Sequence, residues 1–388
     1  SNFKNRGSYG LRGHDQVPYT RFLYMGITTL NDSPSYQTGY GSHKESHNGP
    51  TFSRFENEDM TLEVGQKLNV GADNHLFNSI NLTVDAFREI RSNILTTKGS
   101  IPNYLGAAKT VIYGNFAKVK NWGVDLAVDY GKQINRDLSI QFKGTFTFAR
   151  NRVMETDEAA DIRPALSAVG KPLNTLWGYV ADGLYIDEAD IANNPTSTLG
   201  NITIAAGDVK YVDQPDVNGN YDGQIDSDDR VAIGLPTIPE IIYGFGPSIT
   251  WKKWDFSVFF QGQANVSLMM SGFEPFGTQS KNNVLEWIAE DYWSKENQNP
   301  NAKYPRLTKY NNNNNMQSST YWLRNAAFLK LKNAEVGYNF KWGRVYMSGT
   351  NLLTFSPFKL WDPEMGGGKG MAYPTQRTFN LGVQITFK

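Results

Sequence analysis

One stretch of the chain has the residue types and spacing of a calcium-binding loop. Oxygen-bearing side chains recur at every second position around Gly223, and glycine permits the sharp turn of an EF-type loop. Hard carboxylate, amide and carbonyl oxygens at this spacing can wrap around a Ca²⁺ ion. The predicted ligands, in order, are Asn218, Asn220, Asp222, the carbonyl group of Gln224, Asp226 and Asp229.

Two of these positions depart from the usual calcium loop. The first ligand, Asn218, stands where aspartate is usual, and the last, Asp229, stands where a bidentate glutamate is usual. A solvated acidic turn that needs no ion therefore remains the alternative interpretation. If calcium binds, we expect its role to be structural.

No set of residues in the chain predicts catalysis. Carboxylates such as Asp187, Glu188 and Asp190 are plentiful, but nothing fixes two of them at the separation that a glycosidase needs. Serines lack the sharp strand-to-helix turn of a nucleophile elbow. We therefore expect a protein that is not an enzyme.

Some predicted loop residues are candidates for binding or for mobility. Aromatic rings can stack on sugars, although packing within a loop core is the simpler explanation for each of them. The run 311–315 consists of asparagine alone and predicts a mobile loop. A short helix that stiffens its loop is predicted over 281–293. The aromatic candidates are Trp177, Tyr179, Trp361 and Tyr373.

Composition narrows the class of protein. The 38 basic and 38 acidic residues balance, which argues against a nucleic-acid partner. There is no cysteine, so disulfides and thiolate metal sites are excluded. No apolar run approaches the roughly 18 residues of a membrane helix. The chain begins with Ser1 and carries no signal segment, so we interpret it as a fragment or a processed chain.

Ten segments alternate apolar and polar residues with a period of two, the pattern of strands whose faces meet different surroundings. In 137–148, for example, Leu138 and Ile140 alternate with Ser139 and Gln141. Near 331–334 the apolar phase slips, which predicts a β-bulge. The predicted strands are 2–10, 59–71, 78–91, 121–130, 137–148, 240–251, 253–261, 326–340, 343–353 and 378–388.

Short and long links alternate strictly between these strands. This puts every short turn at one end of the sheet and every long loop at the other, as in a transmembrane barrel. Trp251 and Trp254 at one short turn fit the aromatic girdles of such barrels. A soluble sandwich or propeller remains the alternative, although loops this long are uncommon there. The predicted long loops cover about 11–58, 92–118, 151–239, 266–325 and 354–375.

Groups of residues along nearly the whole chain resemble, in order and spacing, the SusC-like family of TonB-dependent transporters. No single group is diagnostic, but their combination is specific. Members often carry a tighter Asp-Val-Asn-Gly-Asp-Gly run. Here Asn220 and Tyr221 interrupt it, which would shift the calcium register to include Asp216 or abolish binding. The resembling segments include Asn121–Asp125 (NWGVD), Tyr243–Phe245 (YGF), Trp322–Asn325 (WLRN), Ser348–Thr354 (SGTNLLT) and Trp361–Glu364 (WDPE).

The resemblance implies an all-β, transmembrane antiparallel barrel of about 22 strands in the bacterial outer membrane. Residues 1–388 would be its carboxyl-terminal half, with the ten strands as its last ten, the long loops extracellular and the plug domain absent. The implied partners are a SusD-like surface lipoprotein, TonB through the absent amino-terminal part, outer-membrane lipid, and an oligosaccharide or peptide as cargo. A soluble surface glycan-binding β-protein and a passive porin are the open alternatives.

Overall fold

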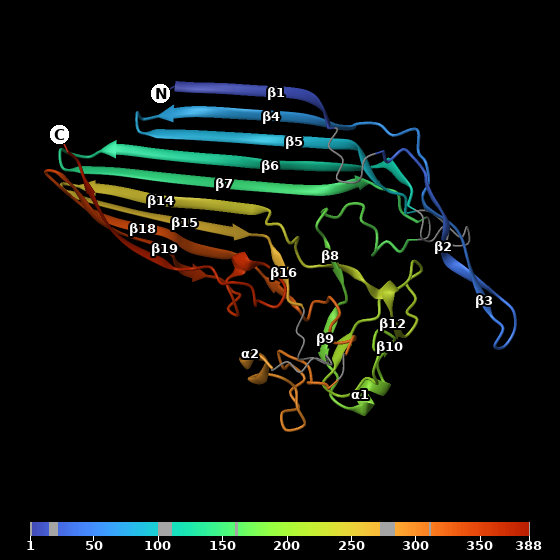
Figure 1. Cartoon of the computed structure of the whole chain (residues 1–388). Helices are drawn as coiled ribbons and strands as arrows, with labels where there is room; N and C mark the ends of the chain where they lie inside the picture. The colour runs from blue at the N-terminus through green and yellow to red at the C-terminus, as the bar shows by residue number, and fades with distance from the viewer. Residues whose placement is uncertain are drawn as a thin grey trace.

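One antiparallel sheet of ten strands forms the body of the computed structural model, which describes residues 2–14, 22–99, 111–159, 162–271, 284–309 and 312–387. The strands follow one another in chain order across the sheet (Figure 1). All ten predicted strands are confirmed. They are β1 (Asn2–His14), β4 (Glu63–Leu76), β5 (Ile80–Thr97), β6 (Tyr113–Gln133), β7 (Leu138–Glu155), β14 (Ile241–Trp251), β15 (Trp254–Ala264), β18 (Phe328–Phe340), β19 (Gly343–Phe355) and β20 (Thr378–Ile385).

Tight turns close one end of the sheet. Between β14 and β15 only Lys252 and Lys253 intervene; Lys252 adopts a positive φ of 55°, and Trp251 stands directly opposite Trp254. Both tryptophans are exposed at this end. The opposite end carries every long connection, so the predicted alternation of short and long links is also confirmed.

The predicted bulge in β18 is confirmed at Lys332. The ladder from β18 to β19 skips from Leu331 to Asn333, and the ladder to β15 shifts between the partners of the same two residues. One extra residue on β18 therefore accounts for the slipped apolar phase in the sequence.

The two faces of the sheet differ in chemistry because neighbouring residues point to opposite sides. Asp85, Asp125 and Thr147 stand opposite one another on β5, β6 and β7. One position away, Val84, Leu126 and Phe146 form an apolar row. Cross-strand register therefore builds one polar face and one apolar face from the alternating pattern.

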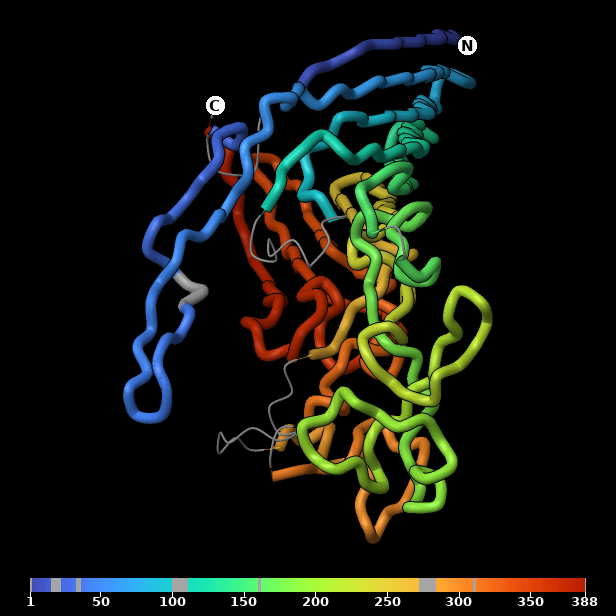
Figure 2. The backbone as a smooth tube through the Cα atoms, turned by 90° about the vertical axis from the view of Figure 1, so that its right-hand side faces the viewer, coloured from blue at the N-terminus to red at the C-terminus, as the bar shows by residue number. Residues whose placement is uncertain are grey.

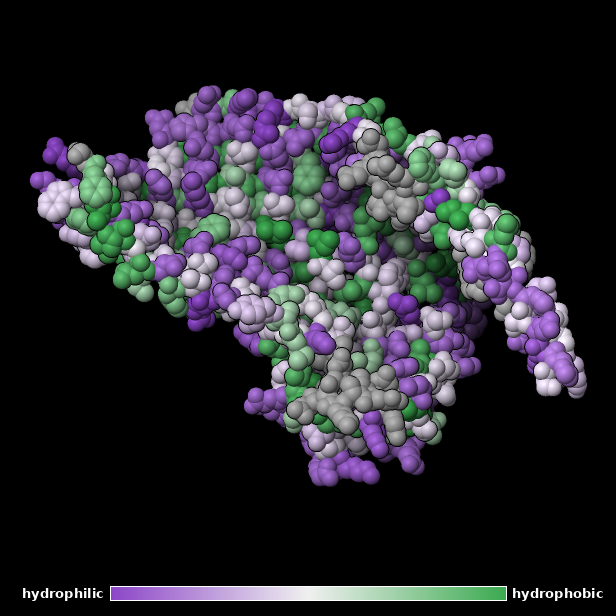
Figure 3. All heavy atoms as spheres, viewed as in Figure 1, coloured by the Kyte–Doolittle hydropathy of each residue, from purple (hydrophilic) through white to green (hydrophobic). Residues whose placement is uncertain are grey.

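The sheet is bent into a trough, as the rotated view shows (Figure 2). Hydrophilic side chains cover much of the sheet face turned towards the viewer in Figure 3. On the apolar stripe Phe146 is 37% exposed, Leu381 80% and Ile385 59%, so these side chains do not form a dry interior. Among the strands that the structure describes, β1 and β20 have one neighbour each, so the sheet is an open arc.

The buried apolar cores lie in the long connections. One core contains Tyr179, Leu184, Val209, Tyr211 and Ile225, none more than 4% exposed. This region contains the short strands β8 (Leu176–Gly178), β9 (Ala181–Leu184), β10 (Thr196–Ser197), β11 (Val209–Tyr211), β12 (Gln224–Ile225) and β13 (Val231–Ile233), with helix α1 (Glu188–Ala192) and the 3₁₀ turn η2 (Ser227–Asp229). A further 3₁₀ turn, η3 (Pro363–Met365), lies in the connection after β19.

A second core joins the two carboxyl-terminal long connections. It contains Trp322 and Phe358, with Trp361 packed against it. Helix α2 (Glu286–Ala289) is shorter than the predicted 281–293, and its Ile288 is fully buried in this core; residues 281–283 lie outside the described part. Strands β16 (Ser267–Met269) and β17 (Leu323–Asn325) pair beside it, and β2 (Ile27–Thr38) pairs with β3 (Glu45–Arg54) in a projecting hairpin (Figure 1).

The asparagine run is not a mobile loop in its described part, residues 312–315. Asn312, Asn314 and Asn315 are fully buried, because Asp208 gathers this segment around one carboxylate. Asp208 accepts hydrogen bonds from the side chains of Asn312 (2.8 Å) and Asn315 (2.9 Å) and from Arg306 (2.7 Å). Asn311 lies outside the described residues.

Within the described part of the chain, no helix is long and apolar enough to cross a membrane.

Candidate binding cavity

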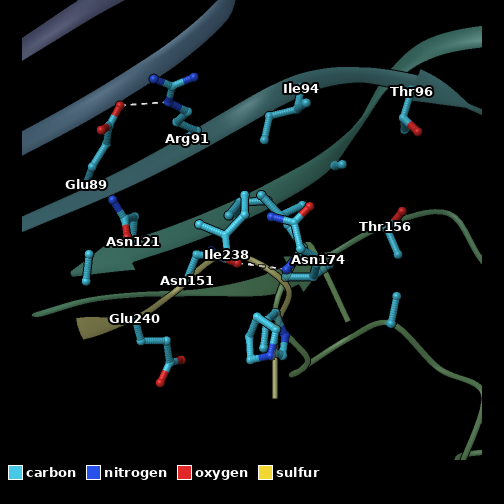
Figure 4. Close-up of a pocket in the computed structure, with 18 of the residues that line it drawn as sticks. Glu89, Arg91, Ile94, Thr96, Asn121, Asn151, Thr156, Asn174, Ile238 and Glu240 are labelled. Atoms are coloured by element: carbon cyan, nitrogen blue, oxygen red, sulfur yellow. Dashed lines mark hydrogen bonds and ion pairs between the residues drawn. The ribbon is translucent and has the colours of Figure 1, made fainter. Parts of the chain in front are cut away.

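A cavity of about 710 Å³ lies where the polar face of the sheet meets the long connections. One wall comes from the loop ends of β5, β6 and β7, and the other from loop segments around 172–177 and 236–240 (Figure 4). Glu89, Asn121 and Asn151 stand opposite one another in consecutive strands and all line it. Asn121 lies four residues from Asp125, so the cavity belongs to the polar face.

An ion-pair network fixes the strand wall. Arg91 donates from Nε to Glu89 Oε1 (2.7 Å) and from Nη1 to Glu63 Oε1 (3.1 Å). Lys67 adds a longer contact to Glu89 (3.7 Å). Because both carboxylates are already paired with cations, this wall presents hydrogen-bonding groups rather than a free base.

Glu240 contributes a second charged group. Its carboxylate accepts from Arg150 Nε (2.8 Å) and Nη2 (2.6 Å) in a bidentate pair, and Glu240 is only 6% exposed. Such paired geometry holds the segment before β14 against β7.

Trp177 supplies the largest aromatic surface of the cavity. It lies on β8, where it stands opposite Ala232 of β13, and its ring is half-buried. Gly178 next to it is required by close packing, because a Cβ there would lie 2.3 Å from the carbonyl oxygen of Ser318. Apolar side chains share the lining with Trp177, namely Ile94, Leu95, Val119, Val153, Leu173 and Ile238.

The four predicted aromatic candidates lie in different surroundings. Tyr179 is 4% exposed within a loop core, and Trp361 packs edge-on against Phe358 at 4.6 Å, so both follow the simpler prediction of packing. Tyr373 is 79% exposed and does not line this cavity. Of the four, only Trp177 combines an aromatic face with the cavity.

The six predicted calcium ligands fall into three pairs. Asp226 and Asp229 lie together: Asp226 Oδ1 accepts from Asp228 N (2.8 Å), and Asp229 Oδ2 accepts from Asp226 N (2.7 Å), which caps the turn η2. Asp222 and Gln224 are exposed, and Asp222 Oδ1 accepts from Gln224 N (2.8 Å).

Asn218 and Asn220 belong instead to an exposed turn organised by Asp216. Asp216 Oδ1 accepts from the backbone N–H groups of Asn218 (2.7 Å) and Asn220 (2.9 Å). The N–H of Asn220 is the main reason that the pKa of Asp216 lies below its ordinary value. Among the described residues, no three acidic or histidine side chains stand together at metal-binding geometry, and calcium binding stays a prediction.

A further charged cluster anchors the connection after β19. Lys330 of β18 is 1% exposed, and its Nζ contacts Asp362 Oδ2 (2.7 Å) and Glu364. Burial alone would raise the pKa of Asp362, but Lys330 and the N–H of Glu364 outweigh it, so this pKa is lowered. The pKa of Glu364 is lowered in the same way, against its burial, by Lys330 and Lys332.

Sequence reasoning did not single out Glu63, Glu89, Arg91 or Glu240. The available signal was a charged residue on the polar stripe of a strand, close to the end that carries a long loop. That signal becomes specific only when strand register brings such residues together.

The family model described as "TonB dependent receptor-like, beta-barrel" matches residues 15–352. The chain is 24% identical to TonB-dependent receptor P3 of Formosa agariphila, over 99% of this chain and 39% of that protein. It is 22% identical to TonB-dependent receptor SusC of Bacteroides thetaiotaomicron, over 100% of this chain and 38% of SusC.

Solved structures share the fold. A structure titled as the RagAB peptide transporter superposes with a TM-score of 0.70 at 21% identity, covering 99% of this chain and 41% of the matched chain. The chain therefore spans about two fifths of the length of the relatives that it matches.

Proposed function

Since the chain belongs to the TonB dependent receptor-like β-barrel family, as a SusC-like member of the outer membrane, we propose that it forms wall and outer loops of an energised nutrient importer. The proposed cargo is an oligosaccharide, captured together with a SusD-like surface lipoprotein. TonB would supply the energy through a part of the protein outside this chain. The long connections would then be the extracellular loops, and the cavity beneath them would face incoming cargo.

The observation that carries this proposal is the position of the cavity. It lies on the polar face, under the folded loops, and not on the apolar face. A polar face enclosed by a barrel becomes its lumen, while an apolar face meets lipid. Cargo that passes the loops would therefore reach Trp177 and the amides of Asn121 and Asn151 first.

The lining suits a sugar chain. Trp177 offers a flat apolar surface for a pyranose ring, and amide and carboxylate groups can bond to the hydroxyls around it. Few convergent polar groups on an apolar lining are a general property of small-molecule sites.

A peptide is the second candidate cargo. The RagAB structures are titled as a peptide transporter or importer, and their fold matches this chain. The paired charges of Glu63, Glu89 and Arg91 could bind peptide backbone or charged termini. A peptide is therefore the alternative to a sugar chain as the cargo of this cavity.

Binding measurements on the full-length transporter separate these candidates. Calorimetric titration with a panel of neutral oligosaccharides and a panel of mixed peptides should give heat with the oligosaccharides. Heat with peptides alone would transfer the assignment to peptide import. Uptake that persists in a cell lacking TonB would contradict energised import and favour a passive pore.

A further inference from the structure

Asp213 holds a buried carboxylate oxygen that has no hydrogen-bond partner among the residues that the structure describes. The residue is 7% exposed; its Oδ2 accepts from Gly223 N (2.8 Å), while Oδ1 is buried and has no partner in the described ranges. Leaving one oxygen of a buried carboxylate without a partner is costly, because the lost hydration is not replaced. Such an atom calls for an explanation, and a bound cation would provide one.

A second buried carboxylate lies close to Asp213. Asp229 is 3% exposed, and its Oδ1 accepts from Gln214 N (2.7 Å), the residue that follows Asp213. Asp229 Oδ2 accepts from the backbone N–H of Asp226 (2.7 Å), so these hydrogen bonds hold three acidic residues in one loop. Carboxylates gathered in this way repel one another, and a bound cation would offset that repulsion.

Gly223 connects Asp213 to the predicted ligand series. Its φ of +73° makes the sharp bend, and its N–H donates to Asp213 across ten residues. The intervening turn is self-contained, because Asp216 satisfies the N–H groups of Asn218 and Asn220. The chain between Asp213 and Asp222 can therefore be read as an insertion within a shorter loop.

We propose that Asp213, rather than Asn218, is the first ligand of a Ca²⁺ site completed by Asp222, the carbonyl of Gln224, Asp226 and Asp229. All five contributions are hard oxygens, and four are carboxylates, which favours calcium over softer or smaller ions. Among the described side chains no such set has yet converged, so binding draws the exposed Asp222 inward. This assignment is independent of the cargo proposed above.

The site would brace the cavity wall. The turn η2 closes the loop at Asp229 and leads directly into β13, whose Ala232 stands opposite Trp177. Arg230 donates to the carbonyl oxygen of Trp177 over 3.5 Å. Calcium would therefore stabilise the strand pair that presents Trp177.

Calcium titration of the full-length transporter, stripped with chelator in detergent, tests the assignment. Calorimetry should show binding in the range of extracellular modules, roughly 10⁻⁴–10⁻³ M. D213N should weaken it about tenfold or more, since the variant removes the charge of a direct ligand. D216N is the matched control, because the described hydrogen bonds of the Asp216 side chain lie within its own turn. The calcium affinity of D216N should match that of wild type.

A second measurement distinguishes a calcium ligand from a purely structural role of Asp213. In the absence of calcium, residues 213–230 of D213N should resist protease at least as well as the same residues of wild type, because the substitution removes a buried charge. With calcium, wild type should be the better protected. Lower protection of D213N in both conditions, an unchanged calcium affinity in D213N, loss of binding in N218A instead, or no binding heat in wild type would each overturn the assignment.

Discussion

Lys330 Nζ lies 2.7 Å from Asp362 Oδ2, which ties a fully buried cation of β18 to the connection that follows β19. Glu364 contacts the same ammonium group, and Asp362 also caps the turn η3 by accepting from Glu364 N (3.0 Å). One buried charge therefore positions an entire loop segment over the end of the barrel wall.

Replacing Lys330 with methionine should loosen this loop. The two carboxylates would lose their main cation, but their side chains are 19% and 26% exposed, so water can partly replace it. We expect a loss of local stability of about 2 kcal/mol, below the range for fully buried pairs. Protease cleavage within 356–377 measures it. K332M is the control, because Lys332 contacts only Glu364 of this pair, and equal effects of the two variants would contradict the prediction.

Acid should release the same loop in wild type. The pKa values of Asp362 and Glu364 lie below their ordinary values of 3.8 and 4.5. Groups with lowered folded pKa values stabilise the folded state above their ordinary pKa, and that contribution is lost as pH falls through the folded values. Protection of 356–377 should therefore be constant near neutral pH and fall below about pH 4. In K330M this acid dependence should shrink; an unchanged profile would refute the linkage.

Removing the ring of Trp177 should weaken cargo binding. Trp177 lines the cavity, whereas Tyr373 is exposed and lies outside its lining. We expect W177A to reduce affinity about tenfold, near 1.4 kcal/mol, and Y373A to leave it unchanged. Calorimetric titration with the oligosaccharide that gives heat in wild type measures both. A weaker Y373A with an intact W177A would move the binding surface to the outer loop.

A methyl group at Gly178 should separate two packed loop segments. The added Cβ would meet the Ser318 carbonyl oxygen at 2.3 Å, so β8 and the segment at 318 must move apart. G131A is a suitable control, since nothing lies within 4 Å of a Cβ there. We expect G178A to destabilise the loop region by roughly 1–3 kcal/mol, the usual cost of overpacking. Thermal unfolding that is equal in both variants would show that the contact relaxes freely.

Single spin labels can determine which face of the sheet meets lipid. The chain contains no cysteine, so an introduced cysteine is its only labelling site. A spin label at F146C should contact lipid and respond to oxygen. A label at T145C, one residue away on the opposite face, should respond to a water-soluble relaxation agent. The reverse pattern would mean that the apolar stripe lines the lumen.

Strand positions were predictable from sequence because each strand carries its own signal. The alternation in 137–148 marks β7, and the slipped phase near Leu331 marks the bulge in β18. Neither inference depends on distant residues.

The loop interior was not predictable, because distant partners decide it. Asn312 and Asn315 are buried only because Asp208, more than a hundred residues earlier, accepts their hydrogen bonds. The carboxylate of Asp213 is likewise joined to the predicted ligand series by the hydrogen bond that it accepts from Gly223, ten residues later. Composition suggested mobility for the first segment, and local spacing favoured Asn218 over Asp213 in the second.

Among the strands that the structure describes, β1 and β20 each have one side without a neighbouring strand, and this affects how the sheet can enter a membrane. Hydrocarbon offers no substitute for water at a row of amide and carbonyl groups, so a bilayer excludes a partial arc. In a closed barrel both margins would be paired, so closure would have to precede or accompany insertion. Insertion into the membrane is therefore expected to be cooperative with barrel closure, and the ten strands would not insert one at a time.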